Sequence, residues 1–129
     1  MKFDIKRVKI FVTVPKENAK EVKKAMFDAG AGVIGNYSCC STSVESVGTY
    51  TPNEKANPYY EVRSSAYMVD NTNPNYANRN NIYNVKEVKI EVVCDVKDVK
   101  NVIKRLREVH PYEEPGIDII PLIDESDFI

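Results

Sequence analysis

The sequence lacks the features that mark several large classes of protein. No apolar run approaches the roughly 20 residues of a membrane span, and the N-terminus, Met1 to Asp4, has no apolar stretch of the signal-peptide kind. Basic and acidic side chains nearly balance, at 18 against 19, so charge favours no nucleic-acid or membrane partner. Gly30, Gly32 and Gly35 follow a predicted helix instead of opening one, which argues against a nucleotide-binding loop. We therefore expect a cytoplasmic protein with neither nucleic acid nor membrane among its partners.

Cysteine is also scarce, and the three present, Cys39, Cys40 and Cys94, are an odd number that fits a reducing compartment. The chain of 129 residues with 43% hydrophobic content is long enough to bury a core without disulfides. We expect one domain over residues 1–129.

Alternating apolar and polar residues predict the strands. The alternation is clearest over Val8 to Val14 and over Val85 to Cys94. A polar-rich strand or hairpin is predicted over Tyr37 to Tyr50, and the apolar run Ile117 to Leu122 predicts the last strand.

Two stretches instead repeat apolar residues every three or four positions, with lysines on the opposite side, which predicts amphipathic helices. The first covers Ala19 to Ala29 and ends at Gly30; the second covers Val96 to Val109, with Asp95 as candidate N-cap.

The order of elements is βαββαβ, which predicts an α+β ferredoxin-like antiparallel sheet with two helices on one face. The other face carries apolar residues as well, namely Phe11, Val93 and Ile120. We expect the chain to cover them by forming a homo-oligomer. The alternative is a monomer whose own loops cover this face.

A long insertion, residues 51–84, separates the second and third core strands. Its 34 residues include nine Asn, five Tyr and three Pro, a composition typical of turns and loops. Within it, Tyr59 to Val69 predicts an extra strand and the remainder a loop. The insertion is either tolerated without a role or contacts a ligand or partner. At the other end of the chain, residues 123–129 form a predicted acidic tail.

The segment His110 to Pro115 is the most distinctive of the chain. It holds the only histidine, two adjacent glutamates and a tyrosine between two prolines. Proline restricts both itself and the residue before it, so the preceding helix is predicted to end at about Val109. Polar groups held so rigidly indicate either a structural corner or one wall of a site.

Two groups of segments resemble a known family. The first group covers the turn at Gly30, Gly32 and Gly35, called the glycine turn below, and the predicted second strand; its segments are Gly30-Ala31-Gly32, Ile34 to Ser41, Gly48 to Pro52 and Ala56 to Pro58. The second group lies near the end of the chain and consists of His110 to Glu114 and Asp118 to Leu122. These segments resemble the domain inserted in bacterial Nif-three-like (YqfO-type) proteins and, more distantly, CutA divalent-cation-tolerance proteins. The resemblance implies a PII-like or CutA-like fold that assembles as a homotrimer, here without the flanking dinuclear-metal domain. It implies no established reaction.

The residues also allow a metal hypothesis. Cys39, Cys40, His110 and Glu113 are donors for Zn or Cu(I) if they converge within one chain or across a subunit boundary. Adjacent strand residues point to opposite faces, so at most one of Cys39 and Cys40 is expected to join His110 from a single chain. We name Cys39, His110 and Glu113 as the candidate metal set. The family pattern has histidine where this chain has Cys39. The structural alternative is a corner histidine bonded to backbone, with Cys94 as a small core residue.

The sequence thus predicts a non-catalytic homotrimeric module that binds a small ligand, metal ion or protein partner at clefts between subunits, in a regulatory or scaffolding role. The predicted wall of that site comprises Tyr37, Cys39, Cys40, His110, Tyr112 and Glu113. One alternative is a CutA-type metal-tolerance protein, and another is an oligomeric enzyme with a shared site. No spacing of nucleophile, base and orienting group favours catalysis.

Overall fold

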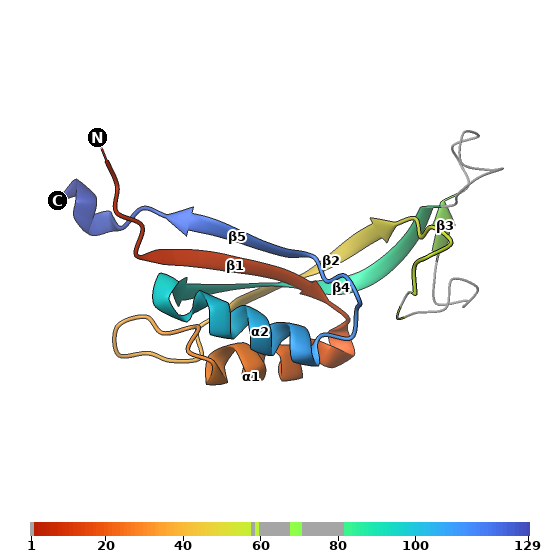
Figure 1. Ribbon diagram of the computed structural model, residues 1–129, viewed down its shortest axis with the longest axis horizontal. Coiled ribbons are helices and arrows are strands. Elements are labelled where there is room, and N and C mark those ends of the chain that lie inside the picture. Colours follow the sequence, from red (N-terminus) through yellow and green to blue (C-terminus); the bar gives the residue numbers. More distant parts are fainter. Residues whose placement is uncertain (1, 58, 60–67, 71–81) are drawn as a thin grey trace.

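An antiparallel sheet carries two helices on one of its faces in the computed structural model, which describes residues 2–57, 59, 68–70 and 82–129 (Figure 1). The elements in chain order are β1 (Arg7–Val14), α1 (Ala19–Asp28), β2 (Thr42–Tyr50), β3 (Met68–Asp70), β4 (Ile82–Asp95), α2 (Val99–Val109) and β5 (Ile117–Leu122). The strands lie in the order β2-β4-β1-β5, and β3 also pairs with β4. The predicted ferredoxin-like βαββαβ fold is confirmed.

The central strand β1 shows how the sequence pattern builds the two faces of the sheet. Every second residue, Val8, Ile10, Val12 and Val14, is buried toward the helices, while the residues between them are only partly covered. Side chains alternate between faces along a strand, so the period-2 pattern separates the helix-covered face from the open one.

The two helices complete the core on the covered face. Val22 and Met26 of α1 and Leu106 of α2 are fully buried and belong to the same cluster as Ile10 and Ile90 of the sheet. Burying each such side chain stabilises the fold by about 1.5–3 kcal/mol. None of the described helices combines the length and the apolar character that crossing a membrane requires.

The opposite face of the sheet bears no helix from the described part of the chain (Figure 1). Lys9 of β1 lies between Val93 and Ile120 in the strand pairing. Ile120 is 47% exposed. Beside this row, Lys89 lies 5.0 Å from the centroid of the Phe11 ring. The face therefore carries the predicted apolar residues Phe11, Val93 and Ile120, and in addition charged side chains, of which Lys9 and Glu91 form an ion pair over 3.3 Å.

Several predicted boundaries need correction. The second strand begins at Thr42 and not at Tyr37, because the preceding residues form a glycine turn. The last three residues of the predicted insertion belong to β4, where Asn84 pairs with Thr49. Asp95 precedes a 3-10 turn, Val96–Asp98, and its side chain makes no capping hydrogen bond.

The predicted extra strand and loop of the insertion fall mostly outside the described residues. Within that stretch, the described strand residues are β3 and the first three residues of β4.

The acidic C-terminal segment is folded onto the N-terminus. Glu125–Phe128 form a 3-10 turn, and the backbone N–H of Ser126 donates to Asp124 Oδ1 over 2.9 Å. The rings of Phe3 and Phe128 lie 5.9 Å apart. What the composition predicted as a tail is thus packed against the opposite terminus.

Candidate functional site

His110 closes the second helix and anchors the turn after it. Helix α2 ends at Val109, as predicted, and His110 adopts an extended conformation with φ −70° and ψ 131°. The side chain is only 7% exposed. Its Nδ1 accepts from the backbone N–H of Tyr112 over 3.1 Å, and its Nε2 lies 2.8 Å from the carbonyl oxygen of Thr13. Because Nδ1 accepts, Nε2 carries the proton and donates to Thr13.

The electrostatics of this corner keep the imidazole neutral. Burial lowers the pKa of His110 below the usual 6.5, the hydrogen bond to Thr13 opposes that change, and the Arg107 charge adds to the lowering. Both ring nitrogens are engaged by backbone groups, so neither lone pair faces outward to a ligand. His110 thus positions the turn, in agreement with the structural alternative.

Tyr112 links the turn to a carboxylate that sequence reasoning missed. Its hydroxyl donates to Glu87 Oε2 over 2.7 Å, and Glu87 is only 7% exposed. The pairing of β1 with β4 ends at Val14 and Val88, so Glu87 lies one residue beyond the last pair. In sequence Glu87 is one of several charged residues in an alternating strand, and only the strand register distinguishes it.

A glycine makes room for this carboxylate. Gly48 of β2 pairs with Val85 on β4, and a Cβ at Gly48 would collide with Glu87 Oε1. The absence of a side chain at position 48 lets the Glu87 carboxylate lie across the end of β2.

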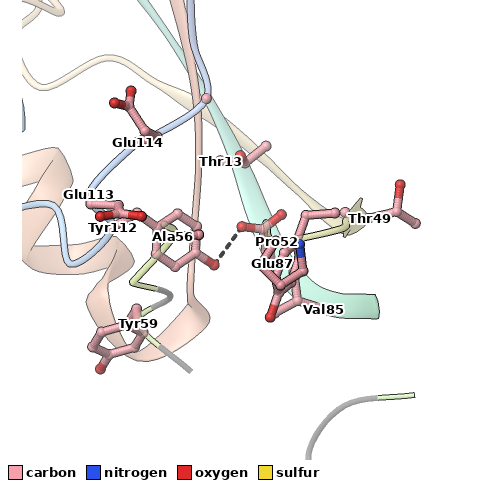
Figure 2. A pocket seen from close by; sticks show the side chains of 13 residues that line it. Thr13, Thr49, Pro52, Ala56, Tyr59, Val85, Glu87, Tyr112, Glu113 and Glu114 are labelled. Atoms are coloured by element: carbon pink, nitrogen blue, oxygen red, sulfur yellow. Dashed lines mark hydrogen bonds between the residues drawn. The ribbon is translucent and has the colours of Figure 1, made fainter. Parts of the chain in front are cut away.

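These residues line a cavity of about 350 Å³ at this end of the sheet (Figure 2). One wall is the turn after α2, and the others come from β1, β2 and β4 and from Pro52, Ala56 and Tyr59. The lining residues are Thr13, Gly48, Thr49, Tyr50, Pro52, Ala56, Tyr59, Val85, Glu87, Tyr112, Glu113, Glu114 and Gly116. Glu113 Oε1 accepts from the backbone N–H of Asn57 over 2.8 Å, which ties the turn to the loop after β2.

The other half of the predicted wall lies elsewhere, in the glycine turn between α1 and β2. Gly32 donates its N–H to the carbonyl of Val93 over 2.8 Å, and Cys40 donates its own N–H to Gly32 over 2.9 Å. Tyr37 is 74% exposed, and Cys39 is exposed with a positive φ of 56°. This turn is held by backbone hydrogen bonds, and its residues 33–39 are exposed.

The predicted wall is therefore split within one chain. Val93, beside the glycine turn, is six residues along β4 from Glu87, a separation of about 20 Å at about 3.3 Å per residue. Figure 1 shows the two turns at opposite ends of the sheet. Tyr112 and Glu113 line the cavity, His110 supports it, and Tyr37, Cys39 and Cys40 take no part.

The donors predicted for a metal ion do not form a site within one chain. Among the described residues no three His, Cys, Asp or Glu side chains are grouped so that they hold a metal ion. Cys39, His110 and Glu113 are not brought together in one chain, and their meeting across a subunit boundary stays a prediction. Cys94 is buried in the core, where burial and then the charges of Asp98 and Asp95 raise its pKa to about 11.

Comparison with known proteins extends this description. No family model matches the sequence. The chain is 33% identical over 119 residues to a protein of Halalkalibacterium halodurans named GTP cyclohydrolase 1 type 2 homolog; the match covers 92% of this chain and 28% of that protein. A protein of the same name from Mycobacterium tuberculosis is 36% identical over 112 residues. The chain thus spans about a quarter of the length of the curated relatives it matches.

Solved structures give the same result. A Bacillus cereus protein related to NIF3 superposes with a TM-score of 0.71 and 34% identity, over 95% of this chain and 27% of that one. The periplasmic divalent cation tolerance protein CutA of Archaeoglobus fulgidus superposes with a TM-score of 0.57 and 15% identity, over 90% of this chain and 83% of that one. The predicted resemblance to both groups is confirmed, and the second match shows the fold alone.

Proposed function

Because the chain resembles one segment of NIF3-related proteins and has the fold of CutA, we propose that it is a non-catalytic, self-associating module that binds a small ligand. The ligand site is the cavity beneath the turn His110 to Pro115, and the module acts in regulation or as a scaffold. The observation that carries the proposal is the buried carboxylate of Glu87, held by Tyr112 at the wall of that cavity.

The chemistry of the cavity favours binding over catalysis. Its described lining includes no cysteine, histidine or lysine, and the nearby His110 has both nitrogens bonded to backbone. A nucleophile with an adjacent base is the arrangement that covalent catalysis needs. A volume of about 350 Å³ falls at the lower end of the range of small-molecule sites.

Self-association is supported by the open face of the sheet. Ile120 is 47% exposed and lies in a row with Val93, and no helix of the described chain covers them. A second and third copy of the chain would remove this surface from water. The proposed assembly is the homotrimer.

Light scattering on the purified protein tests the assembly. A trimer has a mass of about 44 kDa, against 14.6 kDa for one chain. Ile120→Glu places a charge on the open face and is expected to release the monomer. Ile129→Glu, at the fully exposed C-terminal residue, is the matched control and leaves the mass unchanged. A monomeric wild type at micromolar concentration contradicts the proposed assembly.

NMR screening with mixtures of small metabolites tests the ligand site. Binding is expected to shift the backbone amides of residues 112–114, 116 and 48–50, while those of residues 32–40, at the other end of the sheet, serve as the internal control. If no mixture shifts the first set, or if both sets shift equally, the cavity is not the ligand site.

A further inference from the structure

The lining of the cavity has a one-sided charge. Three carboxylates, those of Glu87, Glu113 and Glu114, line it, and no basic side chain does so among the residues that the structure describes. Glu113 and Glu114 are exposed, but Glu87 is only 7% exposed. Glu87 has no ion-pair partner among the described residues. A buried carboxylate without a counter-charge is costly, so the site is complementary to a cation.

The Glu87 carboxylate offers one oxygen to a ligand. Its Oε2 accepts from the hydroxyl of Tyr112, whereas its Oε1 has no hydrogen-bond partner among the described residues and lies over Gly48. Both Gly48 and Glu87 belong to the cavity lining. Figure 2 shows the Glu87 carboxylate directed toward Tyr112 from the opposite wall. The position is suited to accept a hydrogen bond from an N–H donor of a ligand.

Aromatic rings provide the second element of recognition. The rings of Tyr59 and Tyr112 lie 6.1 Å apart, tilted by 49°, and both line the cavity. The faces of such rings attract cations. They also pack against the apolar part of an amphipathic ligand.

The size of the site separates an organic cation from a metal ion. The three carboxylates share one cavity of about 350 Å³, yet within the described residues they do not converge into a group that holds a metal. A bare divalent ion needs several oxygens at a little over 2 Å. An ammonium or guanidinium group on an alkyl stem instead reaches separated carboxylates and fills the volume between them.

We propose that this cavity binds a small organic cation, an alkylamine or alkylguanidine, with its headgroup on Glu87 and its stem beside Tyr59 and Tyr112. The proposal rests on the proposed function, because it names the ligand class of the same cavity.

A set of probes with four-carbon stems tests the charge preference. Putrescine carries two ammonium groups, agmatine carries one ammonium and one guanidinium group, butanediol is the neutral counterpart, and succinate is the anionic one. In an NMR titration of the wild-type protein, putrescine or agmatine is expected to shift the amides of residues 112–114, 116 and 48–50, whereas butanediol and succinate are expected to leave them unchanged.

Matched variants locate the headgroup. Glu87→Gln keeps the shape and removes the charge, and it is expected to weaken binding of the cation at least tenfold. Glu45→Gln removes an exposed carboxylate of β2, which pairs with Lys16 over 3.7 Å, and leaves binding unchanged. Thermal unfolding of both variants confirms that each is folded.

The outcomes distinguish this inference from the function on which it depends. Binding of succinate or butanediol at the cavity, or cation binding that Glu87→Gln leaves intact, overturns the cation assignment while the ligand site stands. The assignment is also wrong if metabolite mixtures shift the cavity amides but neither putrescine nor agmatine does. If no compound of any charge shifts them, the proposed ligand site fails together with the assignment.

Discussion

Two turns of this chain return from a helix to the sheet, one from α1 to β2 and one from α2 to β5, and they are stabilised in different ways. The turn after α2 is held by side chains: His110 bonds to backbone at both ring nitrogens, and Tyr112 bonds to Glu87. The turn after α1 is held by backbone hydrogen bonds, has a positive φ at Gly32 and Cys39, and exposes its residues 33–39 to solvent. The side-chain network forms part of the wall of a cavity with carboxylates in its lining, whereas the backbone-held turn only redirects the chain.

The largest expected contrast comes from His110→Ala. The substitution removes two hydrogen bonds, leaves the carbonyl of Thr13 and the N–H of Tyr112 without their partner, and empties a buried position, at a cost of about 2–4 kcal/mol. Urea unfolding measures the loss. Tyr37→Ala, at the other turn, is the control and is expected to change stability by less than about 0.5 kcal/mol. Equal losses would show that the two turns do not differ as described.

The glycine turn has its own sensitive position. Gly32 has φ +82°, and a Cβ there would lie 2.9 Å from Phe27 Cδ1 and 3.0 Å from the carbonyl oxygen of Cys40. Gly32→Ala combines backbone strain with a clash and is expected to destabilise by about 2 kcal/mol. Gly35→Ala, at φ +58° with nothing within 4 Å of the new Cβ, carries only the backbone cost of about 1 kcal/mol. If thermal unfolding ranks the two in the reverse order, close packing does not define this turn.

The sequence predicted the fold well because periodicity reports which face of the core a residue occupies. β1, β4 and both helices followed from that pattern, and Pro111 correctly placed the end of α2 after Val109. Periodicity does not report which end of the sheet a turn occupies, and the predicted wall joined two turns that lie apart.

The order of the elements along the chain could have predicted that the two turns lie apart. The first strand-helix-strand unit is β1-α1-β2, and the second, β4-α2-β5, runs antiparallel to it in the sheet. Equivalent turns of two such units must lie at opposite ends. The burial of Glu87 was beyond prediction, because it depends on the register at which β1 stops pairing with β4.

Tyr112→Phe probes the side-chain network more finely. The variant keeps the ring and removes the donor to Glu87, leaving a buried carboxylate with one fewer hydrogen bond, and the expected loss is about 1–2 kcal/mol. Tyr37→Phe is the matched control. A double-mutant cycle with Glu87→Gln is expected to show coupling between Tyr112 and Glu87. Strict additivity of the two substitutions would mean that the hydrogen bond contributes nothing to stability.

The two turns are also expected to differ in how their contribution to folding stability depends on pH, because His110 in the turn after α2 is the only histidine of the chain. Burial lowers the pKa of His110 in the folded state, so between that lowered value and the usual 6.5 the unfolded chain binds more protons. The contribution of neutral His110 is fully present above pH 6.5 and is lost as the pH falls, by at most about 1.4 kcal/mol per pH unit.

The stability advantage of the wild type over His110→Gln is therefore expected to shrink between pH 7 and pH 5, measured by urea unfolding. Because His110 is the only histidine, its imidazole signal in NMR reports the folded pKa directly. A measured pKa at or above 6.5 contradicts the proposed role of burial.

The smallest expected effect is at Cys39, whose φ of +56° is a conformation that glycine adopts freely. Cys39→Gly relieves strain in the folded state of about 1 kcal/mol, but glycine also increases the conformational entropy of the unfolded chain, so the net change is within about 0.5 kcal/mol of zero. The more informative measurement is binding of putrescine, which is expected to be unchanged. Weaker binding in this variant would connect the glycine turn to the cavity about 20 Å away, and a shared site between neighbouring subunits is the arrangement that would make such a connection.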